Sequence, residues 1–279
     1  MPRILDYNGQ EAVRTETVAS IVALKSQDPD SKKKQLAQVT ASNADEAAAA
    51  EAAGVEMVVC LSDAVLAVRQ GSSSVFVTAA IDFTGAVTLD ELLGVALGAL
   101  SDGADAVITA RRLDCVRRLA EEDIPVMGHL GFVPKKSTLY GGVRGVGKTA
   151  DEALNLWRQF EELEEAGAFA VECELIPSRV MAEINQRTAM TTISLGSGPD
   201  ADVIFLFSSD ICGEGARVPR HARAYGDLAA LHTQIAEERT AAIKAFRADV
   251  ASKSYPDATE VVGVDDAEFE RFVEVLRKS

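Results

Sequence analysis

The sequence has 279 residues, 47% of them hydrophobic and 25% charged, which is ordinary composition for a globular protein with a large core. Its formal net charge of −15 disfavours nucleic acid as a partner, because an acidic surface repels phosphate groups. No stretch holds the roughly 18 apolar residues that cross a bilayer, and residues 1–13 lack an apolar signal core. We therefore expect a cytoplasmic protein that makes no contact with a membrane.

Eight short apolar runs recur along the chain. Each is apolar at consecutive positions, which is typical of a parallel strand that is buried on both faces. The predicted strands are Leu36–Val39, Met57–Leu61, Val75–Ala80, Ala106–Ile108, Pro125–Gly128, Ala170–Cys173, Thr191–Leu195 and Val203–Phe207.

Helical patterns lie between these runs. Asn43–Ala53 is rich in Ala and Glu, and capping boxes at Thr88–Glu91 and Thr149–Glu152 each open a helix. Pro177 can begin a further helix, and a last helix is expected from Asp265 to Leu276. In the helix after Thr149, the spacing predicts a buried stripe of Leu154, Trp157, Phe160 and Leu163.

Alternating strands and helices predict an α/β protein with a (β/α)8 TIM barrel, and an open Rossmann-like sheet is the alternative. No linker divides the chain, so we expect a single barrel domain over 1–279. It would carry a short N-terminal extension and the C-terminal helix, packed on the barrel or on a neighbouring subunit.

Polar residues follow the predicted strands, at the end of a barrel where active sites form. Glu174 follows an apolar strand, where a carboxylate can act as a general base; a rim glutamate paired with arginine is the equal alternative. His129 could bind a substrate oxygen, although a histidine tied to backbone carbonyls is commoner. The other candidates are Ser62, Asp63, Asp82, Arg111 and Arg112.

The segment Gly142–Thr149 fits the pattern G-x-x-x-x-G-K-[ST] of a phosphate-binding loop. That motif needs a strand directly before it, whereas residues 135–141 are loop-like. We interpret the match as coincidence and the glycines as part of a flexible loop over the barrel mouth.

Several segments together resemble the ketopantoate hydroxymethyltransferase family, in the same order from about Leu36 to Pro256. The most specific are Pro125–Pro134, the Glu165–Pro177 segment with its Val-Glu-Cys-Glu-Leu-Ile-Pro, and Val218–Tyr225. The resemblance implies a barrel of the phosphoenolpyruvate/pyruvate type and a homo-oligomer.

The same resemblance implies a chemistry. Family members transfer a one-carbon unit from methylenetetrahydrofolate to a small 2-oxo acid of the 3-methyl-2-oxobutanoate type, as a step of pantothenate biosynthesis. A magnesium ion holds the acid and stabilises its enolate. Glu174 falls on the family's base, and His129 falls on its substrate-side histidine.

This sequence departs from the family where the metal and the acid are held. The family's Gly-Asp-Ser is here Leu61-Ser62-Asp63, and its second metal aspartate aligns with Ala80, two residues before Asp82. We expect Asp63 and Asp82 to be rebuilt magnesium ligands.

The family's lysine and glutamate, two residues apart, align with Ile108 and Ala110. Arg111 and Arg112 follow directly and could supply positive charge for a carboxylate. We expect these two arginines, with Ser62, to bind the substrate.

Three other functions stay open. Asp82-Phe-Thr-Gly85 is loosely similar to a segment of the phosphoenolpyruvate mutase/isocitrate lyase group, which would make the protein a carbon–carbon lyase. A barrel that has lost its metal ligands could be a non-catalytic binding relic. The third is a nucleotide-binding protein that uses Gly142–Thr149.

Overall fold

The structure is a computed structural model that describes residues 3–26, 34–82 and 84–278. The chain falls into two compact units, Met1–Gly226 and Asp227–Ser279, and all barrel strands lie in the first. None of the helices in the described ranges is long and apolar enough to cross a membrane.

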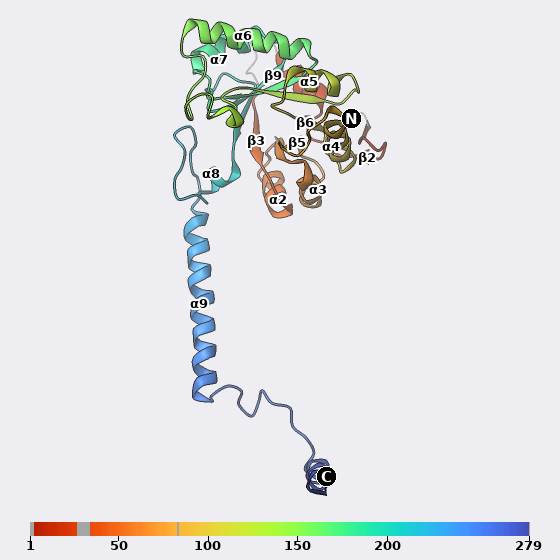
Figure 1. The fold of residues 1–279 in the computed structure, drawn as a ribbon, viewed down its shortest axis with the longest axis vertical. Helices are drawn as coiled ribbons and strands as arrows, with labels where there is room; N and C mark the ends of the chain where they lie inside the picture. The colour runs from red at the N-terminus through yellow and green to blue at the C-terminus, as the bar shows by residue number, and fades with distance from the viewer. Residues whose placement is uncertain (1–2, 27–33, 83, 279) are drawn as a thin grey trace. The chain divides into compact units, whose positions relative to one another are not determined.

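Eight parallel strands form a closed barrel in the order β10-β3-β4-β5-β6-β7-β8-β9. Among them, Figure 1 labels β3, β5, β6 and β9. All eight predicted runs are strands, and the expected (β/α)8 class is confirmed. Their bounds are β3 Leu36–Thr40, β4 Met57–Leu61, β5 Phe76–Ala80, β6 Ala106–Ile108, β7 Val126–Gly131, β8 Ala170–Glu174, β9 Thr191–Leu195 and β10 Val203–Leu206.

Six helices follow the strands from β3 to β8. They are α2 Ala44–Ala52, α3 Val65–Gly71, α4 Leu89–Ser101, α5 Leu113–Ala120, α6 Ala150–Glu165 and α7 Ser178–Asn185. Residues 196–202 connect β9 to β10 without a helix, so the expected alternation is wrong at that crossing. Three 3₁₀ turns and a short helix complete this part of the chain: η1 Ala23–Ser26, η2 Ser62–Ala64, η3 Pro134–Lys136 and α8 Ser208–Cys212.

The N-terminal segment closes one end of the barrel. It forms a hairpin of β1 Ile4–Leu5 and β2 Glu11–Ala12, followed by α1 Val18–Val22. Ile21 is fully buried in the same apolar cluster as the side chains that fill the barrel interior. Thr191 at the start of β9 donates a hydrogen bond to the Ile21 carbonyl at 2.9 Å. Because the N-terminal segment covers the end of the barrel where the strands begin, a ligand site can form only at the other end, where the strands finish.

The second unit holds α9 Leu228–Ser252 and α10 Asp266–Lys278. Asp227 caps α9 by accepting a hydrogen bond from the backbone amide of Ala230 at 3.1 Å. The predicted last helix is confirmed in α10, whereas α9 was not anticipated. Packing of α10 on the barrel or on a neighbouring subunit stays a prediction, as does the single domain over 1–279.

Helix α6 corrects one detail of the predicted packing. Its buried side chains are Leu156, Phe160 and Leu163, whereas Leu154 is 55% exposed. The predicted stripe was therefore wrong at Leu154, and Leu156 takes the inward place four residues before Phe160. A helix repeats every 3.6 residues, so positions 156, 160 and 163 share a face.

Two substitutions in α6 test this packing. Leu156→Ala removes a side chain that is 1% exposed and is expected to lower the free energy of unfolding by about 2–5 kcal/mol. Leu154→Ala, the matched control on the exposed face, should change it by only about 0.5 kcal/mol. Urea unfolding followed by circular dichroism measures both, and equal losses would contradict the assigned face.

Candidate active site

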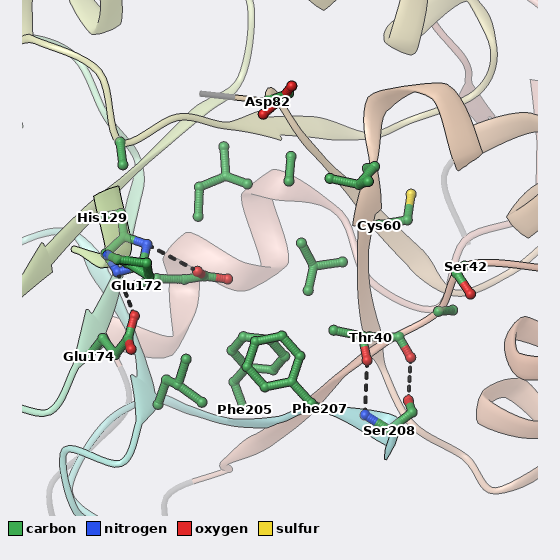
Figure 2. Close-up of a pocket in the computed structure, with 18 of the residues that line it drawn as sticks. Thr40, Ser42, Cys60, Asp82, His129, Glu172, Glu174, Phe205, Phe207 and Ser208 are labelled. Carbon is green, nitrogen blue, oxygen red and sulfur yellow. Dashed lines mark hydrogen bonds and ion pairs between the residues drawn. The ribbon is translucent and has the colours of Figure 1, made fainter. Parts of the chain in front are cut away.

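A cavity of about 550 Å³ opens at the end of the barrel where the strands finish. One part of its wall is apolar, with Val59, Ile108, Leu195, Phe205 and Phe207. Figure 2 shows Phe205 and Phe207 side by side in this wall, and their ring centroids are 5.2 Å apart. An apolar wall with a few polar groups is the usual form of a small-molecule site.

The polar part of the wall is acidic. It holds five hydroxyl side chains and five carboxylates: Thr40, Ser42, Thr109, Ser208 and Ser209, and Glu46, Asp82, Glu172, Glu174 and Glu214. Of the described residues that line the cavity, none is lysine or arginine. His129 is therefore the only basic side chain in this described lining.

His129 lies between two carboxylates (Figure 2). Its Nε2 is 3.1 Å from Glu174 Oε2 and 3.0 Å from the Phe132 carbonyl oxygen. Its Nδ1 is 3.6 Å from Glu172 Oε2. All three side chains are largely buried, so the contacts act where water screens them little.

Strand geometry produces this cluster. Successive side chains of a strand point to opposite faces, so Glu172 and Glu174 share the inner face of β8. On β7, His129 is the register partner of Glu172, and Gly131 is the partner of Glu174. The predicted strand ended at Gly128 and so placed His129 just after it. In the structure His129 lies inside β7.

The backbone around Glu174 is tightly constrained. A Cβ atom at Gly131 would lie 2.2 Å from the Glu174 carbonyl oxygen, so only glycine fits there. That oxygen accepts a hydrogen bond from the Phe132 amide at 2.8 Å. Leu175, the next residue, has a φ of +52°, a strained conformation for a side chain with a Cβ atom. These features fix the direction of the Glu174 side chain.

The burial of the cluster changes its protonation. Burial by itself lowers the pKa of His129, but the hydrogen bond to Glu174 and the charges of Glu172 and Glu174 outweigh it and raise that pKa. Burial raises the pKa of Glu172, against the opposing effects of His129 and Gln38. The cluster therefore binds protons more tightly than isolated side chains would.

The sequence reasoning missed Glu172 and its partner Gln38. Gln38 Nε2 donates to Glu172 Oε1 at 3.0 Å from across the barrel, and both side chains are buried. A signal was present, since Glu172 and Glu174 are two residues apart in a strand and so must face the same way. Gln38 gave no comparable signal, because β3 and β8 are far apart in the sequence.

Cys60 also lines the cavity, and burial raises the pKa of its thiol to about 12. A thiol with this pKa is protonated near neutral pH and is a poor nucleophile. Cys60 and Cys173 are both buried and carry free thiols.

Asp82 lines the cavity, as the sequence reasoning expected for a residue of the site. Its carboxylate accepts hydrogen bonds from the Thr84 hydroxyl at 2.8 Å and the Thr84 amide at 3.3 Å. Figure 2 shows Asp82 apart from the cluster of His129, Glu172 and Glu174.

Four predicted site residues do not line the cavity. Ser62 and Asp63 belong to η2, which turns away directly after β4 ends. The Arg111 guanidinium donates to the carbonyl oxygens of Ala86 and Val87, and that of Arg112 binds Asp114 at 2.7 Å on the surface. Because these arginines are held by other partners, the structure does not bring them to the acid-binding position expected of them.

The described donor set does not fit a protein-held magnesium ion. Such an ion needs several oxygen ligands in close to octahedral geometry. Asp82 reaches the cavity and Asp63 does not, and residues 3–26, 34–82 and 84–278 contain no group of three acidic, histidine or cysteine side chains that could hold a metal. Asp63 and Asp82, the two magnesium ligands predicted from the sequence, therefore do not come together at this cavity.

The segment Gly142–Thr149 does not have the geometry of a phosphate-binding loop. The turn η3 and further turns precede it instead of a strand. The backbone amides of Gly147 and Lys148 donate to Glu152 Oε2 at 3.2 and 3.0 Å. An internal carboxylate thus takes the amides that a phosphate would need, which supports the interpretation of coincidence.

The closed parallel barrel, with its acid–imidazole cluster at the carboxyl ends of the strands, is the architecture of a (β/α)8 barrel enzyme. A solved structure of 2,3-dimethylmalate lyase, a phosphoenolpyruvate mutase/isocitrate lyase superfamily member, shares the fold. It is 16% identical with a TM-score of 0.50, over 83% of this chain and 88% of that one.

The sequence comparisons identify the family. The ketopantoate hydroxymethyltransferase family profile matches residues 61–258. The 3-methyl-2-oxobutanoate hydroxymethyltransferase of Roseiflexus sp. (strain RS-1) is 32% identical over 86% of this chain and 94% of its own length. That of Pyrobaculum islandicum is 38% identical over 46% of this chain and 50% of its own length. The chain belongs to the ketopantoate hydroxymethyltransferase family of enzymes, which confirms the resemblance found in the sequence.

The protonation of the cluster predicts a dependence of stability on pH. The folded protein keeps on the His129–Glu172 pair a proton that the unfolded chain releases near the ordinary histidine pKa of 6.5. The stability that this proton provides is complete below that pH and is lost as the pH rises through the raised folded-state pKa. The variant His129→Gln/Glu172→Gln lacks both groups.

We expect the free energy of unfolding of the natural protein, relative to that double variant, to fall as the pH rises above about 6.5 and through the raised folded-state pKa. The fall should be about 1.4 kcal/mol for each unit by which a pKa is raised. Urea unfolding at a series of pH values measures the difference. A difference that is constant, or that grows with pH, would contradict the assigned direction.

Proposed function

We propose that this protein removes the C3 proton of a small branched 2-oxo acid and joins the resulting enolate to a one-carbon unit. The proposed acid is of the 3-methyl-2-oxobutanoate type, because the family relatives carry that compound in their names. The observation that supports the proposal is the buried Glu174 carboxylate, which faces the cavity 3.1 Å from His129 Nε2.

Glu174 is the proposed base. Its Oε2 is a hydrogen-bond partner of His129 Nε2 at 3.1 Å, which holds the carboxylate in the wall of the cavity. In the proposed step, the C3–H bond breaks and the proton goes to Glu174. The bonding electrons form the C2–C3 double bond, and the carbonyl oxygen becomes an enolate oxygen.

His129 is proposed to face the developing negative charge. It is the only basic side chain in the described lining, and positive charge or a hydrogen-bond donor near an enolate lowers the barrier. The Thr40 hydroxyl lies on the side of the cavity across from His129 (Figure 2), and its oxygen accepts a hydrogen bond from the Ser208 amide at 2.9 Å. We expect this hydroxyl to donate its hydrogen to the carboxylate of the acid.

The remaining parts of the family's chemistry stay predictions. They include magnesium and methylenetetrahydrofolate, the homo-oligomer, the cytoplasmic location, and the roles of Ser62, Arg111 and Arg112 in binding substrate and of Asp63 and Asp82 in binding metal. Since the described donors do not assemble a magnesium site at the cavity, no step of the proposal depends on the ion.

Proton exchange tests the proposal directly. In deuterated buffer, the natural protein should replace the C3 hydrogen of 3-methyl-2-oxobutanoate with deuterium, followed by loss of the proton NMR signal. Glu174→Gln removes the base and should slow the exchange by at least about 10²-fold. The assay is run with and without magnesium, so that any dependence on the ion is measured separately.

Glu183→Gln is the matched control, since Glu183 lies on the outer helix α7 and pairs with Arg187. It should exchange at the rate of the natural protein. Full exchange in Glu174→Gln would overturn the role of Glu174. Absence of exchange with every acid in a panel, with or without magnesium, would favour a non-catalytic binding relic.

A further inference from the structure

Glu172 has no part in the proposed proton abstraction, although it is one of the most buried carboxylates of the barrel. It is 6% exposed and lies on β8 two residues before Glu174, on the same inner face. Gln38 from β3 donates to its Oε1 at 3.0 Å, and its Oε2 faces His129 Nδ1 at 3.6 Å (Figure 2). A carboxylate in such a place is costly unless another group offsets its charge.

The protons on His129 can be assigned from its partners. The Phe132 carbonyl oxygen can only accept a hydrogen bond, and it lies 3.0 Å from Nε2. Nε2 therefore carries a hydrogen, which is directed towards the Phe132 carbonyl and the Glu174 carboxylate. Nδ1 is left as the position whose protonation can vary, and Glu172 is the carboxylate that faces it.

Two arrangements of one proton satisfy this geometry. Either the proton lies on Glu172 and the imidazole is neutral, or it lies on Nδ1 and an imidazolium faces a carboxylate. The proton moves between one oxygen and one nitrogen, and nothing else is consumed. Gln38 favours the second arrangement, because a donor hydrogen bond stabilises the ionised carboxyl group.

The surrounding charges act in the same direction. Glu174 faces His129 from β8, and the other carboxylates of the cavity wall are Glu46, Asp82 and Glu214. All of them favour a positively charged imidazole, and the described lining contributes no lysine or arginine to oppose it. The pKa of His129 is raised in agreement with this.

We propose that Glu172 is a positioning residue that shares a single proton with His129 and holds the imidazole as an imidazolium with its Nε2–H directed at Glu174. The meaning of this pair for catalysis rests on the proposed function. There, it directs a hydrogen of the imidazole at the proposed base Glu174 and gives the otherwise acidic cavity its positive charge for an anionic substrate. The pair itself can be tested without any substrate.

NMR of the full chain with ¹⁵N-labelled histidine tests the assignment. The sequence has three histidines, and His129→Gln identifies the signals of His129. Near neutral pH we expect Nε2 of His129 to be protonated, and Nδ1 to be the nitrogen that loses its proton as the pH rises. A protonated Nδ1 with a bare Nε2 would overturn the proposal.

Glu172→Gln removes the charge but keeps the shape and a hydrogen-bonding group. The pKa of His129 should fall by about one unit or more, as expected when an opposite charge within about 4–6 Å is lost. Glu214→Gln, which removes a different carboxylate of the same cavity, should leave the pKa of His129 close to that of the natural protein. Equal titration of His129 in Glu172→Gln and the natural protein would overturn the proposal.

The exchange assay separates this inference from the proposed function. If 3-methyl-2-oxobutanoate exchanges, the pH profile of the rate in Glu172→Gln should shift towards lower pH with the pKa of His129, and an unshifted profile would count against a role for Glu172. If no acid exchanges, the proposed function fails, whereas the NMR titration still decides whether Glu172 and His129 share a proton.

Discussion

Burial of charge at the carboxyl ends of the strands of a closed parallel barrel governs this site. A barrel brings the carboxyl ends of its strands into one ring, so polar side chains from strands that are distant in sequence meet where little water reaches. Glu172, Glu174 and His129 meet in this way on β7 and β8. In such surroundings a carboxylate needs a partner, and the imidazole between the two acids is that partner. The raised pKa values of His129 and Glu172 follow from this arrangement.

The wall of the cavity sets this chain apart from what its family resemblance implies. The resemblance predicts a metal ion and a cationic side chain for the acid, whereas the described lining contains five carboxylates and no lysine or arginine. Within the described lining, His129 is the basic side chain that can supply positive charge, and Glu172 faces its Nδ1 at 3.6 Å. The resemblance assigns the family's base to Glu174, whereas the described lining lacks the cationic side chain that the same resemblance implies.

The segment Gly142–Thr149 shows why a motif needs its structural context. Its letters match a phosphate-binding loop, yet the amides of Gly147 and Lys148 bind the Glu152 carboxylate of the following helix. A helix N-terminus attracts negative charge, and here the chain supplies that charge itself. The amides of Gly147 and Lys148 thus bind the first turn of α6 rather than a nucleotide.

The sequence by itself determined the eight strands, most of the helices, the family and the candidates Glu174 and His129. These depend on local pattern: consecutive apolar residues give buried strands, capping boxes begin helices, and ordered segments mark the family. Only the tertiary structure decided that Leu156 rather than Leu154 is buried, that Arg111 binds the Ala86 and Val87 carbonyl oxygens, and that Gln38 reaches Glu172. Each of these depends on which way a side chain points and what it meets across the barrel. Strand register and closure fix such contacts between residues that can be more than a hundred positions apart, and no local pattern encodes them.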